Sequence, residues 1–245
     1  MVNKPLFVAL VSSDPWFSPW NHSVLEVLFH HIRHSGTTDT FFEFLILNPF
    51  VSTWLFAAAF YTFWTKDDEQ KAWRRRCLFR VVVAFGISVL ITLIFRPWIS
   101  WPAPTRNTTY QQLFPQYFWG QGTANCFPSH ATLAYFMVAA GFWPLSRRLS
   151  ACFSILAVLL ISLPRVYVGG HYPIDVLASL ILGIVVLAAV WQWPVPETVS
   201  HWLVKAELGA IIRELLFFLW TVELADGFRG TTSLIGTARH VSHWL

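Results

Sequence analysis

The sequence predicts an all-α membrane protein: a helical bundle of five transmembrane helices, or six if the tail also spans, with interfacial helices at both ends. Of its 245 residues, 55% are hydrophobic and 12% are charged, whereas a soluble domain carries about 25% charged residues. Long apolar segments and an uneven distribution of Lys and Arg between loops support the same class. The net charge of +4 then indicates cytoplasmic loops facing anionic lipid rather than a nucleic-acid partner.

A spanning helix needs about 20 mainly apolar residues. The segments that reach or approach this length are 41–64, 81–97, 129–145, 149–166 and 174–193. Pro49 removes a backbone donor and predicts a kink in the first of them. We therefore expect three regions: an N-terminal interfacial segment at 1–40, a transmembrane core at 41–194 and a C-terminal amphipathic tail at 195–245.

The two ends of the chain differ from the core in their polar content. Residues 18–34 combine apolar positions with a histidine-rich side, which is typical of a helix lying in the outer interface. Residues 203–224 are apolar but contain five charged side chains, namely Lys205, Glu207, Arg213, Glu214 and Glu223. The prediction there is an interfacial or partner-docking helix on the cytoplasmic side, and a sixth span is the alternative.

Basic residues predict the orientation. Loops 65–80 and 146–148 hold most of the relevant charges, which are Lys66, Lys71, Arg74, Arg75, Arg76, Arg80, Arg147 and Arg148. The longer loop 98–128 holds only Arg106. The positive-inside rule places the two basic loops in the cytoplasm. Loop 98–128 and the Gly169–Gly170 turn therefore share the outer face.

Ionisable residues at the edge of a membrane core are costly and usually functional. Pro173 is typical of the first turn of a helix, so the last span should begin near Tyr172. His171 then lies just before that turn, and Asp175 is close enough to accept a proton from the imidazole. Such a pair fixes the tautomer and leaves the other ring nitrogen free as a nucleophile or base.

Further groups on the same face suit a phosphate. Arg96 and Arg165 offer planar guanidinium groups that match phosphate oxygens. Gly170, in a two-glycine turn, lets the backbone approach a ligand closely. Amides near Ser129 lie at a helix N-terminus, which favours anions, and His130 is a candidate acid for a leaving group. The pattern predicts phosphoryl transfer without a metal or cofactor, because the outer face offers few carboxylates.

These residues carry a resemblance to a known family. The stretch RVYVGGHYPIDV resembles the third signature of the type 2 phosphatidic acid phosphatase superfamily, with Pro164 in place of its serine. FPSHA resembles the second signature, and FRP resembles the end of the first. The match extends over roughly residues 20–190. Within the superfamily, the layout is most similar to bacterial undecaprenyl-diphosphate phosphatases.

The resemblance implies that His171 forms a phosphohistidine, that Asp175 orients it and that His130 protonates the leaving oxygen. It also implies a phosphate-binding group of Arg96, Arg165 and Ser129. Two departures from the signatures stand out. The lysine of the first signature is replaced by Val89, so we expect Arg106 to supply the missing charge. No glycine separates Ser129 from His130, which turns one of these side chains by roughly 100°.

The expected function is an integral membrane lipid phosphatase acting on an isoprenyl diphosphate or related lipid phosphate, at the periplasmic face of a bacterial inner membrane. The bilayer and the lipid substrate are the expected partners, and the sequence predicts no oligomeric state. A phosphatidate, phosphatidylglycerophosphate or lipid A phosphatase, or a lipid phosphotransferase, is the nearest alternative. A non-catalytic protein that binds anionic lipid is the alternative of another class. In that case Arg165, His171 and Asp175 would form a loop salt bridge, and Ser129 would only cap its helix.

Overall fold

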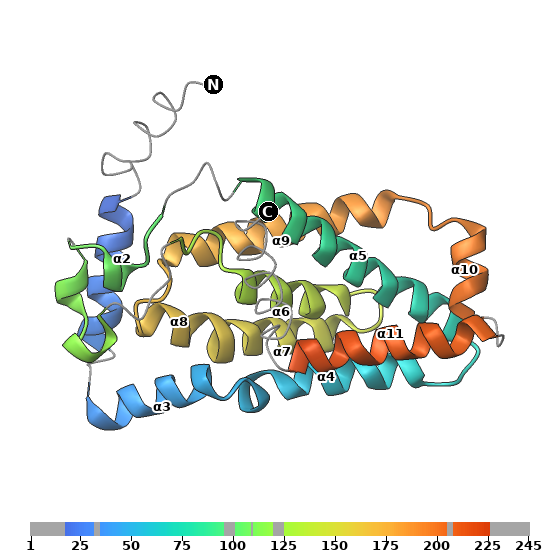
Figure 1. Ribbon diagram of the computed structural model, residues 1–245, viewed down its shortest axis with the longest axis horizontal. Helices are drawn as coiled ribbons and strands as arrows, with labels where there is room; N and C mark the ends of the chain where they lie inside the picture. The colour runs from blue at the N-terminus through green and yellow to red at the C-terminus, as the bar shows by residue number, and fades with distance from the viewer. Residues whose placement is uncertain are drawn as a thin grey trace, which may run out of the picture.

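The computed structural model describes residues 18–31, 35–95, 101–108, 110–119, 125–204 and 208–225. In these ranges the chain is built from helices and turns, without a strand. The long helices lie side by side in one bundle, and α2 (Ser18–His31) runs across one end of it (Figure 1).

Most helices follow one another with short connections, and the connection between α5 and α6 is long. The other α-helices are α3 (Gly36–Leu47), α4 (Pro49–Thr65), α5 (Lys71–Phe95), α6 (His130–Gly141), α7 (Arg147–Leu156), α8 (Leu163–Tyr167), α9 (Pro173–Gln192), α10 (Glu197–Val204) and α11 (Leu208–Ala225). The described part of the connection between α5 and α6 contains the 3-10 turns η1 (Pro104–Arg106), η2 (Gln111–Leu113) and η3 (Gln116–Phe118). A π-helical segment, η4 (Ala157–Ser162), joins α7 to α8.

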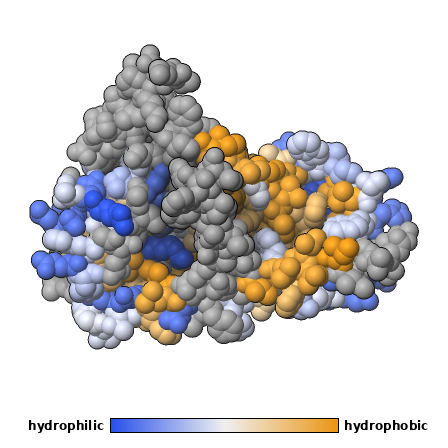
Figure 2. All heavy atoms as spheres, in the orientation of Figure 1, coloured by the Kyte–Doolittle hydropathy of each residue, from blue (hydrophilic) through white to orange (hydrophobic). Residues whose placement is uncertain are grey.

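Three helical stretches within the described residues are long and apolar enough to cross a membrane: Lys71–Ile94, Arg147–Tyr167 and Pro173–Gln192. Each exposes large apolar side chains, for example Leu90, Leu159 and Ile184. Hydrophobic side chains cover the middle of the visible face, whereas hydrophilic ones gather toward its ends (Figure 2). An exposed apolar belt of this kind suits lipid as the solvent. The predicted all-α membrane fold is confirmed.

The other two expected spans consist of shorter helices. Segment 41–64 is divided at Asn48, because α3 ends there and Pro49 begins α4. The kink predicted at Pro49 is thus a break between two helices. Segment 129–145 contains the 12-residue helix α6, which packs against α5, α7 and α9 at the centre of the bundle.

Helix α5 begins at Lys71, well before the expected start at residue 81, and it brings basic side chains into the bundle. Arg74 donates to the carbonyl of Phe63 at 2.6 Å. Arg75 donates to the carbonyl of Leu203 at 2.9 Å and pairs with Glu214 at 2.9 Å. Backbone carbonyls and the carboxylates of Asp68 and Glu214 therefore satisfy charges that were expected in a loop.

Helix α11 packs lengthwise along α4 (Figure 1). The indole of Trp64 stacks on the ring of Phe217 at a centroid distance of 3.4 Å, and its N–H donates to Glu214 at 2.6 Å. Phe60 contacts Trp220 at 4.5 Å. The docking surface of this tail helix within the described residues is thus α4 of the same chain.

A buried carboxylate connects several elements at the end of the bundle near α2. Asp39 on α3 is 5% exposed and accepts a hydrogen bond of 2.6 Å from the hydroxyl of Tyr167 on α8. The hydroxyl of Tyr117 in η3 donates to the other oxygen of the same carboxylate. Asp39 therefore joins α3, α8 and the loop before α6.

The π segment contacts α6 through a pair of hydroxyls. Ser162 lies 3.0 Å from the hydroxyl of Thr132 and also donates to the carbonyl of Ala157 at 3.3 Å. Both hydroxyls are buried. This contact aligns the helix that ends near Arg165 with the helix that begins at His130.

Candidate functional site

A tight turn between α8 and α9 positions His171. Gly169 has a φ of +71°, a conformation that glycine adopts without steric cost. The amides of Gly170 and His171 donate back to the carbonyl of Arg165 at 2.9 and 3.2 Å. The turn thus closes the C-terminal end of α8 in the manner of a glycine-terminated helix, and it presents His171 at the start of α9.

His171 and Asp175 lie together at the N-terminus of α9. Their closest atoms, the imidazole Nδ1 and the carboxylate Oδ2, are 3.5 Å apart, and the Asp175 side chain is fully buried. The same Oδ2 accepts a hydrogen bond of 2.8 Å from the amide of Tyr172. Tyr172 is the N-cap and Pro173 the first helical residue, as the sequence predicts. The other carboxylate oxygen, Oδ1, is buried without a hydrogen-bond partner.

The start of α6 lies against the first turns of α9. The hydroxyl of Ser179, one turn beyond Asp175, donates to the carbonyl of Ser129 at 3.0 Å. Ser129 is the N-cap of α6, but its side chain makes no capping bond, and its buried hydroxyl oxygen has no hydrogen-bond partner. His130 is the first residue of the helix and is half-buried. The second and third signatures therefore meet at one end of the bundle.

The predicted arginines have different positions. Arg165 lies on α8, where one guanidinium nitrogen donates to the carbonyl of Ile161 at 2.8 Å. Arg106 is the last residue of η1 and its side chain is exposed. Arg96 lies outside the described residues, so its predicted contact with phosphate stays a prediction.

The loop before α6 is fastened to the glycine turn. The amide and the hydroxyl of Thr105 both donate to the carbonyl of Gly169, at 3.2 and 3.1 Å. A Cβ atom at Gly169 would lie 2.5 Å from a methyl carbon of Thr105 and 2.8 Å from the ring of Phe114. This position therefore requires glycine for its close packing as well as for its φ, and the contact brings the neighbouring Arg106 to the same end of the protein.

Cys126 also belongs to this cluster, although it was not among the predicted site residues. Its sulfur and one ligand atom each of His171 and Asp175 all lie within 4.8 Å of one another. Burial raises the pKa of the Cys126 thiol, and the charge of Asp175 and a hydrogen bond to that carboxylate raise it further. Cys126 directly precedes the second signature, FPSHA, but nothing in the sequence indicates its contact with His171 and Asp175.

Helix α2 covers the start of α9. The side-chain oxygen of Asn21, which is 1% exposed, accepts a hydrogen bond of 3.2 Å from the amide of Ile174. The ring of His22 lies 5.9 Å from that of Tyr110, and Tyr110 in turn contacts Tyr172 at 5.2 Å. The expected N-terminal helix is thus part of the wall around the His171 cluster.

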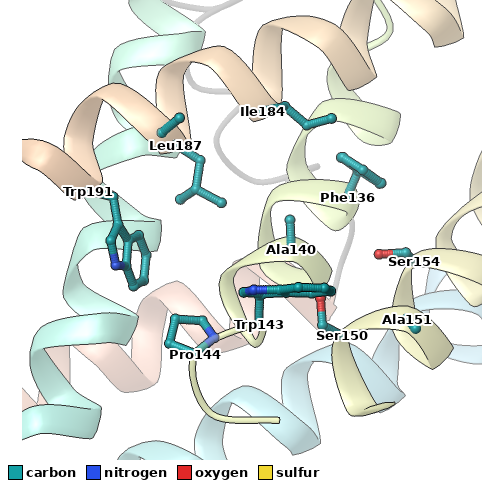
Figure 3. Close-up of a pocket in the computed structure, with 11 residues that line it drawn as sticks. Phe136, Ala140, Trp143, Pro144, Ser150, Ala151, Ser154, Ile184, Leu187 and Trp191 are labelled. Carbon is teal, nitrogen blue, oxygen red and sulfur yellow. The ribbon is translucent and has the colours of Figure 1, made fainter. Parts of the chain in front are cut away.

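An apolar cavity of about 430 Å³ lies at the other end of the bundle. Figure 3 shows its wall, which is formed by α6, α7, α9 and the turn after α6, with Phe136, Trp143, Leu187 and Trp191 as its larger side chains. Trp143 and Trp191 belong to the end of the bundle where α7 begins and α9 finishes. The cavity suits hydrocarbon, and it is separate from the cluster at the start of α9.

Comparison with known proteins agrees with the clustering of the two signatures. Neither a curated protein nor a solved structure matches the chain. Residues 77–198 match the PAP2 superfamily. That range runs from α5 to the start of α10 and includes Cys126, Ser129, His130, Arg165 and the His171–Asp175 pair. Members of this superfamily are phosphatases, so the match supports hydrolase activity on lipid phosphates in a bilayer. Residues 77–198 of this membrane protein form a PAP2 superfamily domain.

Proposed function

We propose that this protein is a membrane lipid phosphatase that acts on an isoprenyl diphosphate or a related lipid phosphate through a phosphohistidine at His171. The observation that carries the proposal is the pairing of His171 with the buried carboxylate of Asp175 at 3.5 Å, inside the PAP2 domain. A carboxylate in this position holds the imidazole in one orientation and stabilises the positive charge that develops on it during attack.

The proposed reaction has two steps. A ring nitrogen of His171 attacks phosphorus, a P–N bond forms, and the bond between phosphorus and the leaving oxygen breaks. His130 donates the proton that this oxygen needs. Water then attacks the phosphohistidine with His130 as the base, which releases inorganic phosphate and restores His171.

Several groups around the turn would hold the phosphate. Arg165 and Arg96 are the proposed guanidinium partners, and Arg106 is the proposed substitute for the lysine replaced by Val89. Ser129 contributes a buried hydroxyl without a hydrogen-bond partner at the N-terminus of α6, where backbone amides favour an anion. Gly170 keeps the backbone beside this space free of a side chain. All of these proposed donors belong to the chain itself, so we propose metal-independent catalysis.

The distribution of basic residues supports a site on the outer side of a bacterial inner membrane. Arg74 and Arg75 lie at the start of α5, and Arg147 begins α7. The His171 turn lies beyond the opposite end of these helices, since α8 closes the helix that α7 begins. With the basic end in the cytoplasm, the lipid tail stays in the bilayer while its headgroup reaches His171 from the outer leaflet.

The test is phosphate release by purified protein from a panel comprising an isoprenyl diphosphate, phosphatidate, phosphatidylglycerophosphate and lipid A, with a chelator present. His171→Ala should abolish release without loss of expression. His201→Ala is the matched control, because His201 is exposed on α10 at the other end of the bundle. Labelled phosphate should be trapped on acid-labile histidine. A stable fold with unchanged turnover in His171→Ala would reject the nucleophile, and a protein that binds lipid without any adduct would be the non-catalytic alternative.

A further inference from the structure

We propose that Cys126, His171 and Asp175 form a binding site for a soft divalent cation of the zinc class. The three residues come from separate parts of the sequence, the loop before α6 and the start of α9, and their ligand atoms all lie within 4.8 Å of one another. A thiol, an imidazole and a carboxylate are the donors that zinc takes in proteins.

The carboxylate gives the second, independent reason. Asp175 is fully buried, and although its Oδ2 accepts the amide of Tyr172, its Oδ1 is buried without a hydrogen-bond partner. A buried anionic oxygen without a partner is costly, and a cation at that position would compensate it. The Cys126 sulfur and a ring nitrogen of His171 are the other two donor atoms of the group.

The distances allow coordination after a small adjustment. Zinc binds sulfur at about 2.3 Å and nitrogen or oxygen at about 2.0–2.2 Å, so tetrahedral ligand atoms lie about 3.5 Å apart. The group must therefore contract by about 1 Å at its widest pair. His171 can supply this movement, because its side chain is 17% exposed and follows the glycine turn. Binding releases the thiol proton, and the fourth position stays open to water or to a phosphate oxygen.

Occupation of this site would regulate the reaction proposed above, and this part of the inference rests on the proposed function. A cation bound to His171 and Asp175 engages the nucleophile and the carboxylate that orients it. Zinc should therefore inhibit phosphate release reversibly, and a chelator should restore it. The site is then an inhibitory metal site in a phosphatase that needs no metal for its chemistry.

Cobalt titration of the full-length protein in detergent, without oxygen, tests the metal site directly. Co²⁺ should bind at one ion per chain and produce the near-ultraviolet charge-transfer band of a thiolate ligand, and Zn²⁺ should displace it. Cys126→Ser should remove the band. Cys152→Ser is the matched control, because Cys152 is an exposed free cysteine on α7. A missing band in the wild type, or a band that survives in Cys126→Ser, overturns the proposal.

Two further measurements cover the case in which Cys126→Ser does not fold. Asp175→Asn should weaken Co²⁺ binding about tenfold or more, since even loss of an outer-shell partner costs 10–100-fold, and unchanged affinity contradicts the site. In the phosphatase assay, Cys126→Ala should be less sensitive to Zn²⁺ than the wild type, with each protein compared to its own metal-free rate. If no lipid phosphate is hydrolysed, the proposed function fails while the cobalt result still decides the metal site. If the protein is active but shows no cobalt band, the proposed phosphatase function is retained and only the metal site is rejected.

Discussion

The hydroxyl of Ser179 on α9 donates a hydrogen bond of 3.0 Å to the backbone carbonyl of Ser129, the N-cap of α6. The same hydroxyl contacts the carbonyl of Asp175 at 2.7 Å. One buried side chain thus connects the helix that begins with His130 to the helix that carries Asp175. The relative position of the proposed acid and the proposed nucleophile depends on this contact.

Ser179→Ala should reduce turnover on a lipid phosphate while leaving the membrane fold intact. Loss of one hydrogen bond costs about 1 kcal/mol of stability, and the carbonyl of Ser129 loses a buried donor. The effect should fall on kcat more than on KM, because the residue aligns two helices rather than contacting substrate. Ser154→Ala on α7 is the control, and equal kinetics for the two variants would contradict the alignment.

Gly169→Ala should destabilise the turn and abolish most activity. The φ of +71° and the 2.5 Å approach of a Cβ atom to Thr105 both oppose a side chain, and backbone strain alone costs about 1–3 kcal/mol. Gly86→Ala on α5 is the matched substitution, because a Cβ atom there meets nothing within 4 Å. That variant should be as stable as the parent or more so. Thermal unfolding in detergent compares them, and equal losses would mean that the turn is not the sensitive point.

The Asp39 carboxylate should stabilise the end of the bundle through its two tyrosine partners. Tyr167→Phe removes a buried hydrogen bond to a charged group, which is worth about 1.5–3 kcal/mol. A double-mutant cycle with Asp39→Asn, read by thermal unfolding, should show coupling between the two positions. Additive effects would show that the bond is not a stabilising contact.

The partner hydroxyl of Tyr117 predicts a pH dependence. Burial, together with the hydrogen bond to Asp39, raises the pKa of Tyr117 from 10.0 to about 12. Because the folded-state pKa is the higher one, the resulting stability is fully present below pH 10 and is lost between pH 10 and about 12. Tyr117→Phe should flatten the unfolding profile across this window, and an unchanged slope would exclude the tyrosine as its source.

Glu214 should hold α11 on the bundle at neutral pH. Burial opposes its ionisation, but hydrogen bonds from Trp64 and Arg213 and the charge of Arg75 lower the pKa of Glu214 below its ordinary value of 4.5. A lowered folded-state pKa means that this stability is present above about pH 4.5 and is lost as the pH falls through the folded-state pKa. Limited proteolysis should release α11 sooner in acid, and in Glu214→Gln even at neutral pH. Equal protection of Glu214→Gln and the parent would show that docking depends on the apolar contacts alone.

The sequence predicted those helix boundaries that a residue at the boundary itself determines, such as a proline. Pro173 identified the start of α9, and Pro49, where a kink was predicted, lies at the break between α3 and α4. The start of α5 could not be predicted in the same way, because Arg74 and Arg75 donate hydrogen bonds to acceptors outside the helix, including the carbonyls of Phe63 and Leu203. A prediction from hydropathy places such arginines in a loop.

The candidate site likewise has a part that the sequence predicts and a part that it does not. The spacing of His171 and Asp175 within one turn predicted that they lie together, because a single helix start determines their separation. Cys126 could not be assigned, since its contact with them depends on how the loop before α6 folds back on the Gly169 turn through Thr105. The number of residues between Cys126 and His171 does not predict that the loop folds back in this way.

The wide turn of η4 determines the direction in which the rest of its helix faces. A π turn amounts to one residue inserted into an α-helix, and each residue rotates the chain by about 100°. Deleting one position from Ala157–Ser162 would therefore swing Arg165 to another side of the bundle while leaving α7 in its lipid-facing register. The lipid-facing register of α7 and the direction of the Arg165 side chain can therefore change separately, although both belong to one continuous helix. Either can change in evolution without the other.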